Sequence, residues 1–154
     1  MARESARGYA IDTNLYIAAY RSDEAQQALD TFVSAETPFL HLTAVVAQEL
    51  LAGVRSAPEL RKLDRHLIDV FVRRGRFHAP SAAGWRESGA VLSALVQREG
   101  LELTRVSKAF GNDVLLAVTC REHGLVLITE NTRDFARIAK YVDFRFEAPW
   151  PLER

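Results

Sequence analysis

The chain has 154 residues, of which 48% are hydrophobic and 26% are charged, and its 20 basic and 20 acidic residues give a formal net charge of zero. This composition is ordinary for a single globular domain over residues 1–154, and it excludes an intrinsically disordered chain. Because the total charge is balanced, it gives no sign of a nucleic-acid-binding protein.

The sequence predicts neither a membrane-spanning helix nor a secretory signal. No apolar run reaches the roughly 18 residues that a membrane helix needs, and the first eight residues, MARESARG, lack the apolar segment of a secretory signal. Cys120 is the only cysteine, so an internal disulfide is impossible, and no Cys/His spacing resembles a zinc site. We therefore expect a cytoplasmic protein with no membrane contact.

In the first third of the chain, strand-like runs alternate with helix signals. Residues 9–11 predict a short apolar strand, and residues 39–42 predict a second one. Ser22 is placed to cap a helix between these strands, because acidic residues and an apolar helical stripe follow it. Thr43 is placed to cap another helix that runs towards Gly53.

Two longer helices are predicted next. One begins after Pro58 and ends at Gly75, and the other ends at Gly100. Residues 76–80 between them, RFHAP, predict a short strand or a connector. The expected apolar faces consist of Leu60, Leu63, Leu67, Val70 and Phe71 in the first helix, and of Trp85, Leu92, Leu95 and Val96 in the second.

The last third of the chain supplies the strongest strand signal. A loop is expected over residues 101–111, and a helix from about Asn112 to a left-handed cap at Gly124. Residues 125–129, LVLIT, are nearly all apolar, which is typical of a strand buried on both faces of a parallel sheet. Residues 143–146 predict a final strand. This alternation indicates an α/β fold with a central, mainly parallel sheet.

Basic residues are concentrated between positions 55 and 76. This span holds seven basic and three acidic residues, a local net charge of +4. The pattern fits either a solvated helical face or a stripe that binds phosphates, and it does not decide between them. The basic residues are Arg55, Arg61, Lys62, Arg65, Arg73, Arg74 and Arg76.

Four acidic residues interrupt apolar patterns. Asp12 closes the first predicted strand, and Asp134 follows the strand at residues 125–129. Glu49 and Asp113 lie three or four residues from apolar members of their own helices, in line with the apolar face. A buried carboxylate without a partner is unfavourable, so such groups are paired, hydrogen-bonded, protonated or bound to metal.

Each of these acids also has a purely structural interpretation. Asp12 is able to form an Asx-turn, and Asp113 and Asp134 are favourable charges in a first helical turn. Glu49 is able to pair with Arg55. Taken singly, these interpretations remain open.

Considered together, the four acids indicate a metal site. In an open parallel sheet, the carboxyl ends of the strands form the crevice where ligands bind, and all four acids are expected at that edge. Four converging carboxylates repel one another unless a cation neutralises them. Oxygen ligands suit magnesium or manganese, and a metal-activated water attacking a phosphodiester is the chemistry that such a site supports.

At these residues the sequence resembles the PIN-domain family, and within it the VapC-type toxins of bacterial toxin–antitoxin pairs. The matching segments occur in the family's order along nearly the whole chain. They are AIDTN around Asp12, HLTAVVAQELLAG around Glu49, GNDVLLAVTCREHG around Asp113 and LVLITENTRDF around Asp134. The resemblance implies a three-layer α/β/α fold and a metal-dependent endoribonuclease.

The resemblance also implies roles for individual residues. The catalytic pocket would consist of Asp12, Glu49, Asp113 and Asp134, with Asp12, Asp113 and Asp134 as the ligands of Mg²⁺ or Mn²⁺. Its supporting residues would be Thr13, Asn14, Thr129 and Asn131. Glu130 is an alternative acid that approaches the same pocket.

The partners that the resemblance implies are RNA, a cognate antitoxin protein and a second copy of the chain in a homodimer. The basic span at residues 55–76 is then a candidate contact for RNA or for the antitoxin. One alternative is a PIN fold that binds RNA or protein without catalysis. Another is a dehalogenase-like phosphatase, which needs a second aspartate two positions after Asp12, where this chain has Asn14.

Overall fold

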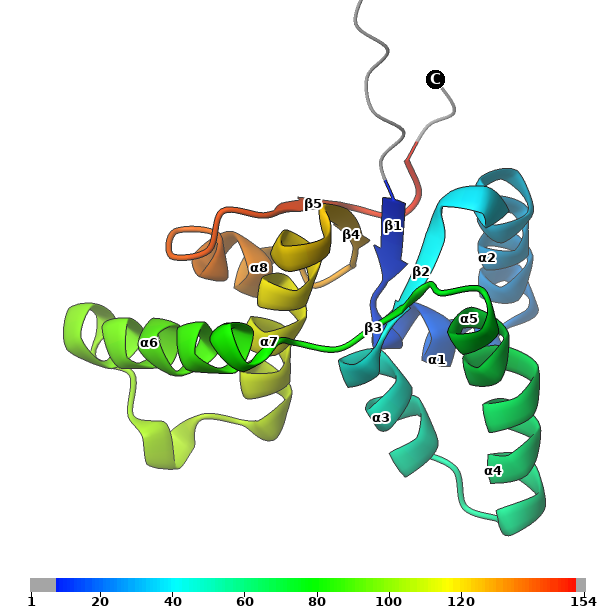
Figure 1. Ribbon diagram of the computed structural model, residues 1–154, viewed down its shortest axis with the longest axis horizontal. Helices are drawn as coiled ribbons and strands as arrows, with labels where there is room; N and C mark the ends of the chain where they lie inside the picture. The colour runs from blue at the N-terminus through cyan, green and yellow to red at the C-terminus, as the bar shows by residue number, and fades with distance from the viewer. Residues whose placement is uncertain (1–7, 152–154) are drawn as a thin grey trace, which may run out of the picture.

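A five-stranded sheet forms the centre of the protein, for which a computed structural model describes residues 8–151 (Figure 1). The strands lie in the order β3-β2-β1-β4-β5, and every neighbouring pair is parallel. This confirms the α/β class and the parallel sheet. The strands are β1 (Gly8–Ile11), β2 (Leu40–Thr43), β3 (Phe77–His78), β4 (Leu125–Ile128) and β5 (Arg145–Glu147).

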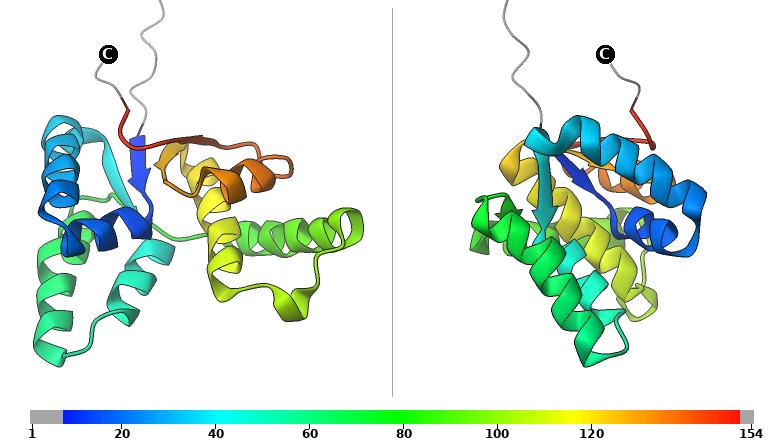
Figure 2. Two further views of the ribbon diagram at one scale, coloured as in Figure 1. Left: turned by 180° about the vertical axis from the view of Figure 1, so that it is seen from behind. Right: turned by 90° about the vertical axis from the view of Figure 1, so that its right-hand side faces the viewer.

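Helices connect the strands and cover both faces of the sheet (Figures 1 and 2). The α-helices are α1 (Thr13–Arg21), α2 (Asp23–Glu36), α3 (Ala44–Ala52), α4 (Ala57–Leu63), α5 (Asp69–Arg73), α6 (Ala82–Glu99), α7 (Lys108–His123) and α8 (Thr132–Ile138). Short 3₁₀ helices span Thr37–Phe39 and Leu103–Arg105, and a π-helical turn spans Asp64–Ile68. No helix within residues 8–151 is long and apolar enough to cross a membrane.

Two hydrophobic cores correspond to the two faces of the sheet. On β1, Ala10 belongs to the core that contains α7, whereas the next residue, Ile11, belongs to the core that contains α1 and α2. On β4, Leu127 and Ile128 divide in the same way. Because successive side chains of a strand point to opposite faces, the sheet lies between two helical layers. The expected three-layer α/β/α arrangement is confirmed.

The helix ends predicted at Ser22, Thr43, Gly100 and Gly124 are confirmed, each by a local cap. Ser22 and Thr43 accept hydrogen bonds from the backbone amides of Ala25 and Val46, as N-caps do. Gly100 and Gly124 end α6 and α7 with φ of 66° and 63°. A residue with a side chain is strained at these angles, which explains why glycine occupies both positions.

The structure corrects three expectations. Helix α7 begins at Lys108 rather than near Asn112, because Ser107 caps it by accepting from the amide of Phe110. The helix predicted after Pro58 contains a π-helical turn. Leu60 and Trp85 do not belong to the packed faces, since 43% and 58% of their surfaces are exposed.

Candidate active site

Asp12 lies where the first strand meets the first helix. It directly follows β1 and is the N-cap of α1, and its Oδ1 accepts a 2.8 Å hydrogen bond from the amide of Thr13. Only 4% of its surface is exposed. Asp12 therefore makes the turn that its structural interpretation required, and the same turn holds its carboxylate at the carboxyl end of the sheet.

The other oxygen of Asp12 is bound from the neighbouring strand. Thr129 directly follows β4, and its hydroxyl donates to Asp12 Oδ2 at 2.7 Å. The same hydroxyl oxygen accepts a hydrogen bond from the amide of Asn131 at 3.0 Å. Thr129 is fully buried, so its position is determined by the sheet and by these two bonds.

Asn131 connects two further acids. Its side-chain amide donates to Asp113 Oδ2 on α7 and to Asp134 Oδ2 on α8, both at 3.2 Å. A single neutral side chain therefore bridges two carboxylates that come from different helices.

Glu49 is held on the other side of Asp12. The hydroxyl of Thr13 donates to Glu49 Oε2 at 2.5 Å, and the side-chain amide of Asn112 donates to Oε1 at 2.7 Å. Since Thr13 also bonds to Asp12, hydrogen bonds link all four predicted acids into one cluster. We call Asp12, Glu49, Asp113 and Asp134 the acidic cluster.

Burial and mutual repulsion change the acid–base behaviour of the acidic cluster. The pKa of Asp113 is raised to about 7, first by burial and then by the negative charges of Asp12, Glu49 and Asp134. Burial also raises the pKa of Asp12, against the lowering effect of its bonds to Thr129 and Thr13. The cluster therefore carries negative charge that its hydrogen bonds do not fully compensate, which favours a cation.

The donor set fits a hard divalent ion, because every candidate ligand is a carboxylate oxygen. Within residues 8–151, however, no three His, Cys, Asp or Glu side chains are arranged closely enough to hold a metal ion together. Hydroxyl and amide donors from Thr13, Thr129 and Asn131 occupy the space between the acids instead. An entering cation has to compete with these donors.

Not every predicted site residue joins the cluster. Asn14 is exposed in the first turn of α1, and Glu130 is exposed after β4; neither takes part in the hydrogen bonds that link the acids. Conversely, Asn112 does bind Glu49 and was not predicted. The only signal for it was its position next to Asp113 in the segment GNDV.

The basic span at residues 55–76 extends from the end of α3 through α4 and α5 to the start of β3. Two of its members are already engaged within the fold: Arg73 pairs with Asp69 at 3.4 Å, and Arg76 donates to the carbonyl of Thr37 at 2.8 Å. Its other basic residues are exposed.

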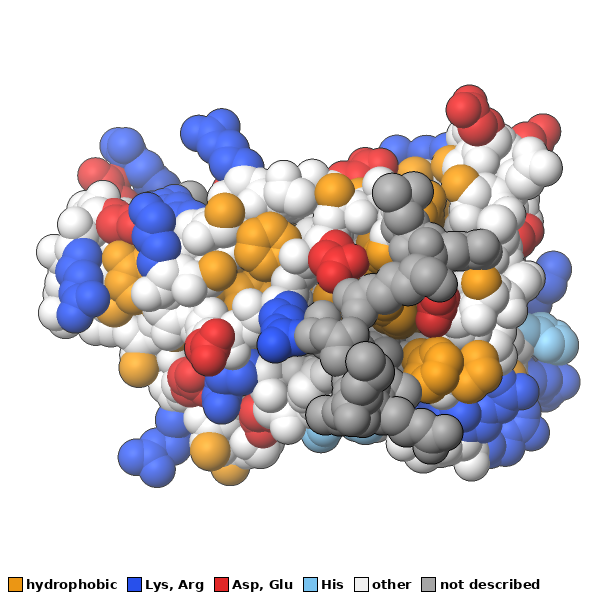
Figure 3. All heavy atoms as spheres, turned by 90° about the horizontal axis from the view of Figure 1, so that it is seen from above, with side chains coloured by type: hydrophobic (Ala, Val, Ile, Leu, Met, Phe, Trp, Pro, Cys, Tyr) orange, Lys and Arg blue, Asp and Glu red, His pale blue; other side chains and the backbone are white. Residues whose placement is uncertain are grey.

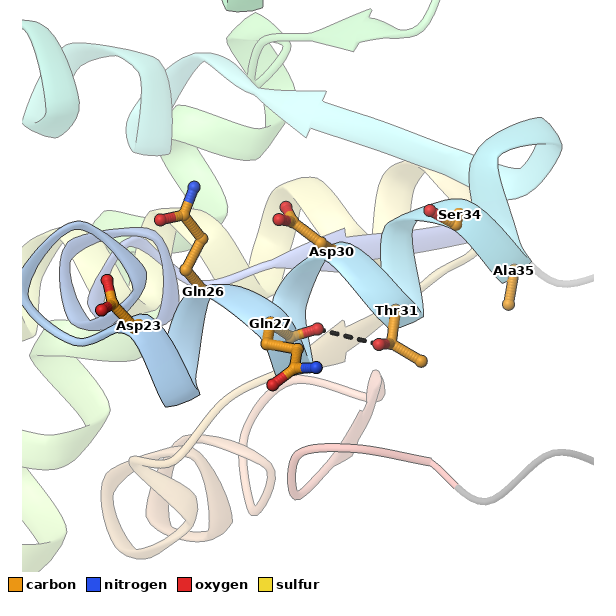
Figure 4. Close-up of a pocket in the computed structure, with 7 residues that line it drawn as sticks. All are labelled: Asp23, Gln26, Gln27, Asp30, Thr31, Ser34 and Ala35. Atoms are coloured by element: carbon orange, nitrogen blue, oxygen red, sulfur yellow. Dashed lines mark hydrogen bonds between the residues drawn. The ribbon is translucent and has the colours of Figure 1, made fainter.

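The hollows on the surface of residues 8–151 include one along α2 and one beside Asp134. The larger one lies along α2 and is lined only by that helix, from Asp23 to Ala35 (Figure 4). Its one marked hydrogen bond, from Thr31 to the carbonyl oxygen of Gln27, lies within the helix. The smaller hollow, of about 480 Å³, contains Asp134 of the acidic cluster. Of these two hollows, the smaller one is therefore the one connected with the candidate site.

Comparison with known protein families gives a match over most of the chain. A family model described as "PIN domain" matches residues 9–141. No curated protein sequence matches the chain.

Several solved structures share the fold. DNA-bound VapBC from Salmonella typhimurium has a TM-score of 0.65 at 21% identity, covering 92% of this chain and 98% of that one. VapBC-1 from nontypeable Haemophilus influenzae has a TM-score of 0.64 at 19% identity, covering 91% and 96%. FitAcB from Neisseria gonorrhoeae has a TM-score of 0.61 at 20% identity, covering 94% and 99%. At these identities, the likeness shows the fold.

Proposed function

This chain belongs to the PIN-domain family, and from that membership we propose that it is a metal-dependent endoribonuclease that acts as the toxin of a toxin–antitoxin pair. One observation carries the proposal: carboxylates from four separate elements are linked by hydrogen bonds at the carboxyl edge of the sheet. The similar structures named as VapBC and FitAcB complexes support the toxin part of the proposal.

In this proposal, Asp12, Asp113 and Asp134 hold the metal, and Glu49 completes the catalytic pocket. When bound, Mg²⁺ or Mn²⁺ supplies an activated water and stabilises the charge on the leaving oxygen. Thr129 and Asn131 orient the carboxylates of Asp12, Asp113 and Asp134. Thr13 orients Glu49 in the same way.

RNA and the antitoxin are the proposed partners. The exposed basic residues among residues 55–76 are the candidate contacts for either partner, since a polyanion and an acidic protein segment are attracted by the same positive charges. We further propose a homodimer, as the family resemblance implies. A similar structure, VapBC2 from Rickettsia felis bound to a DNA fragment from its promoter, supports an antitoxin partner for this chain.

The proposal is tested by incubating the purified protein with a fluorescent single-stranded RNA in Mg²⁺, in Mn²⁺ and in EDTA. We expect internal cleavage with either metal and none in EDTA. Asp113→Asn should abolish cleavage while preserving the fold, and Asp30→Asn, which changes an exposed acid of α2, should cleave like the wild type. Cleavage by Asp113→Asn would contradict the assignment.

A PIN domain that binds RNA or protein without catalysis is the alternative. The same assay distinguishes this alternative from a ribonuclease, because a non-catalytic PIN domain would leave the RNA intact in Mg²⁺ and in Mn²⁺. The phosphatase alternative is disfavoured by Asn14, which replaces the required second aspartate and lies exposed on α1.

A further inference from the structure

The hollow beside Asp134 is lined by α8 and by the end of α6. Its lining consists of Glu99, Arg133, Asp134, Ala136, Arg137 and Lys140. It is the only one of the two hollows that includes a residue of the acidic cluster. A molecule that occupied it would therefore lie next to the proposed site of cleavage.

The basic residues of this hollow follow helical spacing. Arg133, Arg137 and Lys140 are four and three residues apart, so they share one side of α8 and the turn that follows it. At 1.5 Å per residue, they extend over about 10 Å. Asp134, which accepts from the side-chain amide of Asn131 at 3.2 Å, directly follows Arg133, so the row has one end beside the acidic cluster. We call these three residues the α8 basic row.

Glu99 positions two members of the α8 basic row. It accepts from Arg137 Nε at 2.5 Å, lies 3.8 Å from Lys140 Nζ, and also accepts from the hydroxyl of Tyr141 at 3.2 Å. The guanidinium of Arg137 also lies over the ring of Phe110, 5.5 Å from its centre. These contacts hold the two side chains along the wall of the hollow.

Arg133 differs from the other two. It is exposed, and no ion pair or hydrogen bond of its side chain occurs among the described residues. Next to it, Ala136 contributes only a methyl group to the lining, which leaves room for a ligand above the helix. Figure 3 shows basic side chains, with acidic ones between them, at the end of the molecule that carries α6 and α8.

A polyanionic substrate is repelled by the acidic cluster and needs positive charge close to it. The α8 basic row supplies that charge on the side of Asp134, whereas the basic residues at positions 55–76 lie on other elements. We propose that the hollow binds a backbone phosphate of single-stranded RNA adjacent to the scissile bond, with Arg133 as its direct contact and Arg137 and Lys140 behind it. This inference rests on the proposed ribonuclease function.

The test measures RNA binding without turnover. The fluorescence anisotropy of a labelled single-stranded oligoribonucleotide is recorded in EDTA over a range of salt concentrations, for the wild type and for Arg133→Ala. Arg86→Ala is the matched control, because Arg86 is an exposed arginine on α6, outside the hollow. Loss of one phosphate contact should reduce the slope of log affinity against log salt by about 0.7 and weaken binding at low salt by roughly fivefold. Arg133→Lys should largely restore the slope.

The outcomes separate this inference from the function on which it rests. If the wild type cleaves RNA with Mg²⁺ but Arg133→Ala and Arg86→Ala bind it equally well, the inference is wrong and the function stands. If the wild type neither binds nor cleaves RNA, both are wrong. If Arg133→Ala weakens binding of poly-glutamate but not of RNA, the hollow serves an acidic protein segment instead, which also overturns the inference. Circular dichroism establishes that each variant is folded.

Discussion

The hydroxyl of Thr129 donates a 2.7 Å hydrogen bond to Asp12, although 117 residues separate the two in sequence. The parallel pairing of β1 with β4 explains the contact, because it aligns Ile11 with Ile128. The amide of Asp12 extends this ladder by donating to the carbonyl of Ile128 at 2.9 Å. The register of two central strands therefore places a donor beside a buried acid.

Replacing Thr129 with valine should remove this donor while preserving the side chain's shape. The buried carboxylate of Asp12 would lose a bond that lowers its pKa, so we expect the pKa to rise further. An unsatisfied buried acceptor should lower the free energy of unfolding by about 1–3 kcal/mol. Urea denaturation at pH 7 in EDTA measures this change. Thr119→Val is the control, since buried Thr119 donates only to a carbonyl of its own helix, at 2.7 Å. Equal losses in the two variants would contradict the special role of Thr129.

Asp113 should make the metal-free protein less stable as the pH rises. Its pKa is raised to about 7, from the ordinary 3.8 of an aspartate, so the folded state binds more protons than the unfolded state between these values. Its contribution to stability is therefore complete below about pH 4 and is lost as the pH rises to about 7. In EDTA at pH 8, Asp113→Asn should be more stable than the wild type by on the order of 2 kcal/mol, which allows for its partial exposure.

The free energy of unfolding has to be measured for the wild type and for Asp113→Asn at each pH, and the difference between the two compared. Burial, and then the nearby His123 and His41, lower the pKa of His78 to about 4. His78 makes the free energy of unfolding rise with pH, because the unfolded state binds more protons than the folded state between about pH 4 and pH 6.5. Since His78 is present in both proteins, its effect cancels. A stability difference that stayed constant from pH 4 to pH 8 would show that Asp113 titrates normally.

Divalent metal should reverse the instability that the acidic cluster causes. An ion that binds only the folded state adds about 2.7 kcal/mol at a concentration 100 times its dissociation constant. We therefore expect Mg²⁺ or Mn²⁺ to raise the melting temperature of the wild type and EDTA to remove that increase. Asp113→Asn should show little shift, and Asp30→Asn should respond like the wild type. An equal rise in the melting temperature of Asp113→Asn would mean that the ion binds outside the acidic cluster.

The features that the sequence predicted well are those that depend on neighbouring residues. Ser22, Thr43, Gly100 and Gly124 end or begin helices through their own backbone bonds or angles, so each was recognisable without tertiary information. The convergence of the acidic cluster followed from the parallel sheet, because its members lie after strands or near helix starts at one edge.

Apart from the start of α7 and the π-helical turn, the wrong predictions concern contacts between distant segments. Periodicity identified apolar positions such as Trp85 and Leu60, but whether another element covers them depends on packing, and here both are exposed. Asn112 was missed for the same reason: its role becomes visible only when α3 brings Glu49 to within 2.7 Å of its amide. Polar partners of this kind have no periodic pattern in a sequence.

Two glycines of α6 should respond in opposite ways to alanine. A Cβ at Gly89 would meet nothing within 4 Å, so Gly89→Ala should raise the free energy of unfolding by about 0.4–1 kcal/mol through its effect on the unfolded chain. A Cβ at Gly84 would overlap Oε1 of Glu122 and lie 3.2 Å from the buried side chain of Val118.

Gly84→Ala should therefore be destabilising, because Glu122 would have to leave the amide of Ser81, from which it accepts a 3.3 Å bond at the start of α6. Thermal and urea unfolding of both single variants measure the contrast. If the overlap with Glu122 is the cause, adding Glu122→Ala to Gly84→Ala should recover part of the loss, since the methyl group then fits the vacated space. A stabilising Gly84→Ala would mean that α6 and α7 pack less closely than the structure shows.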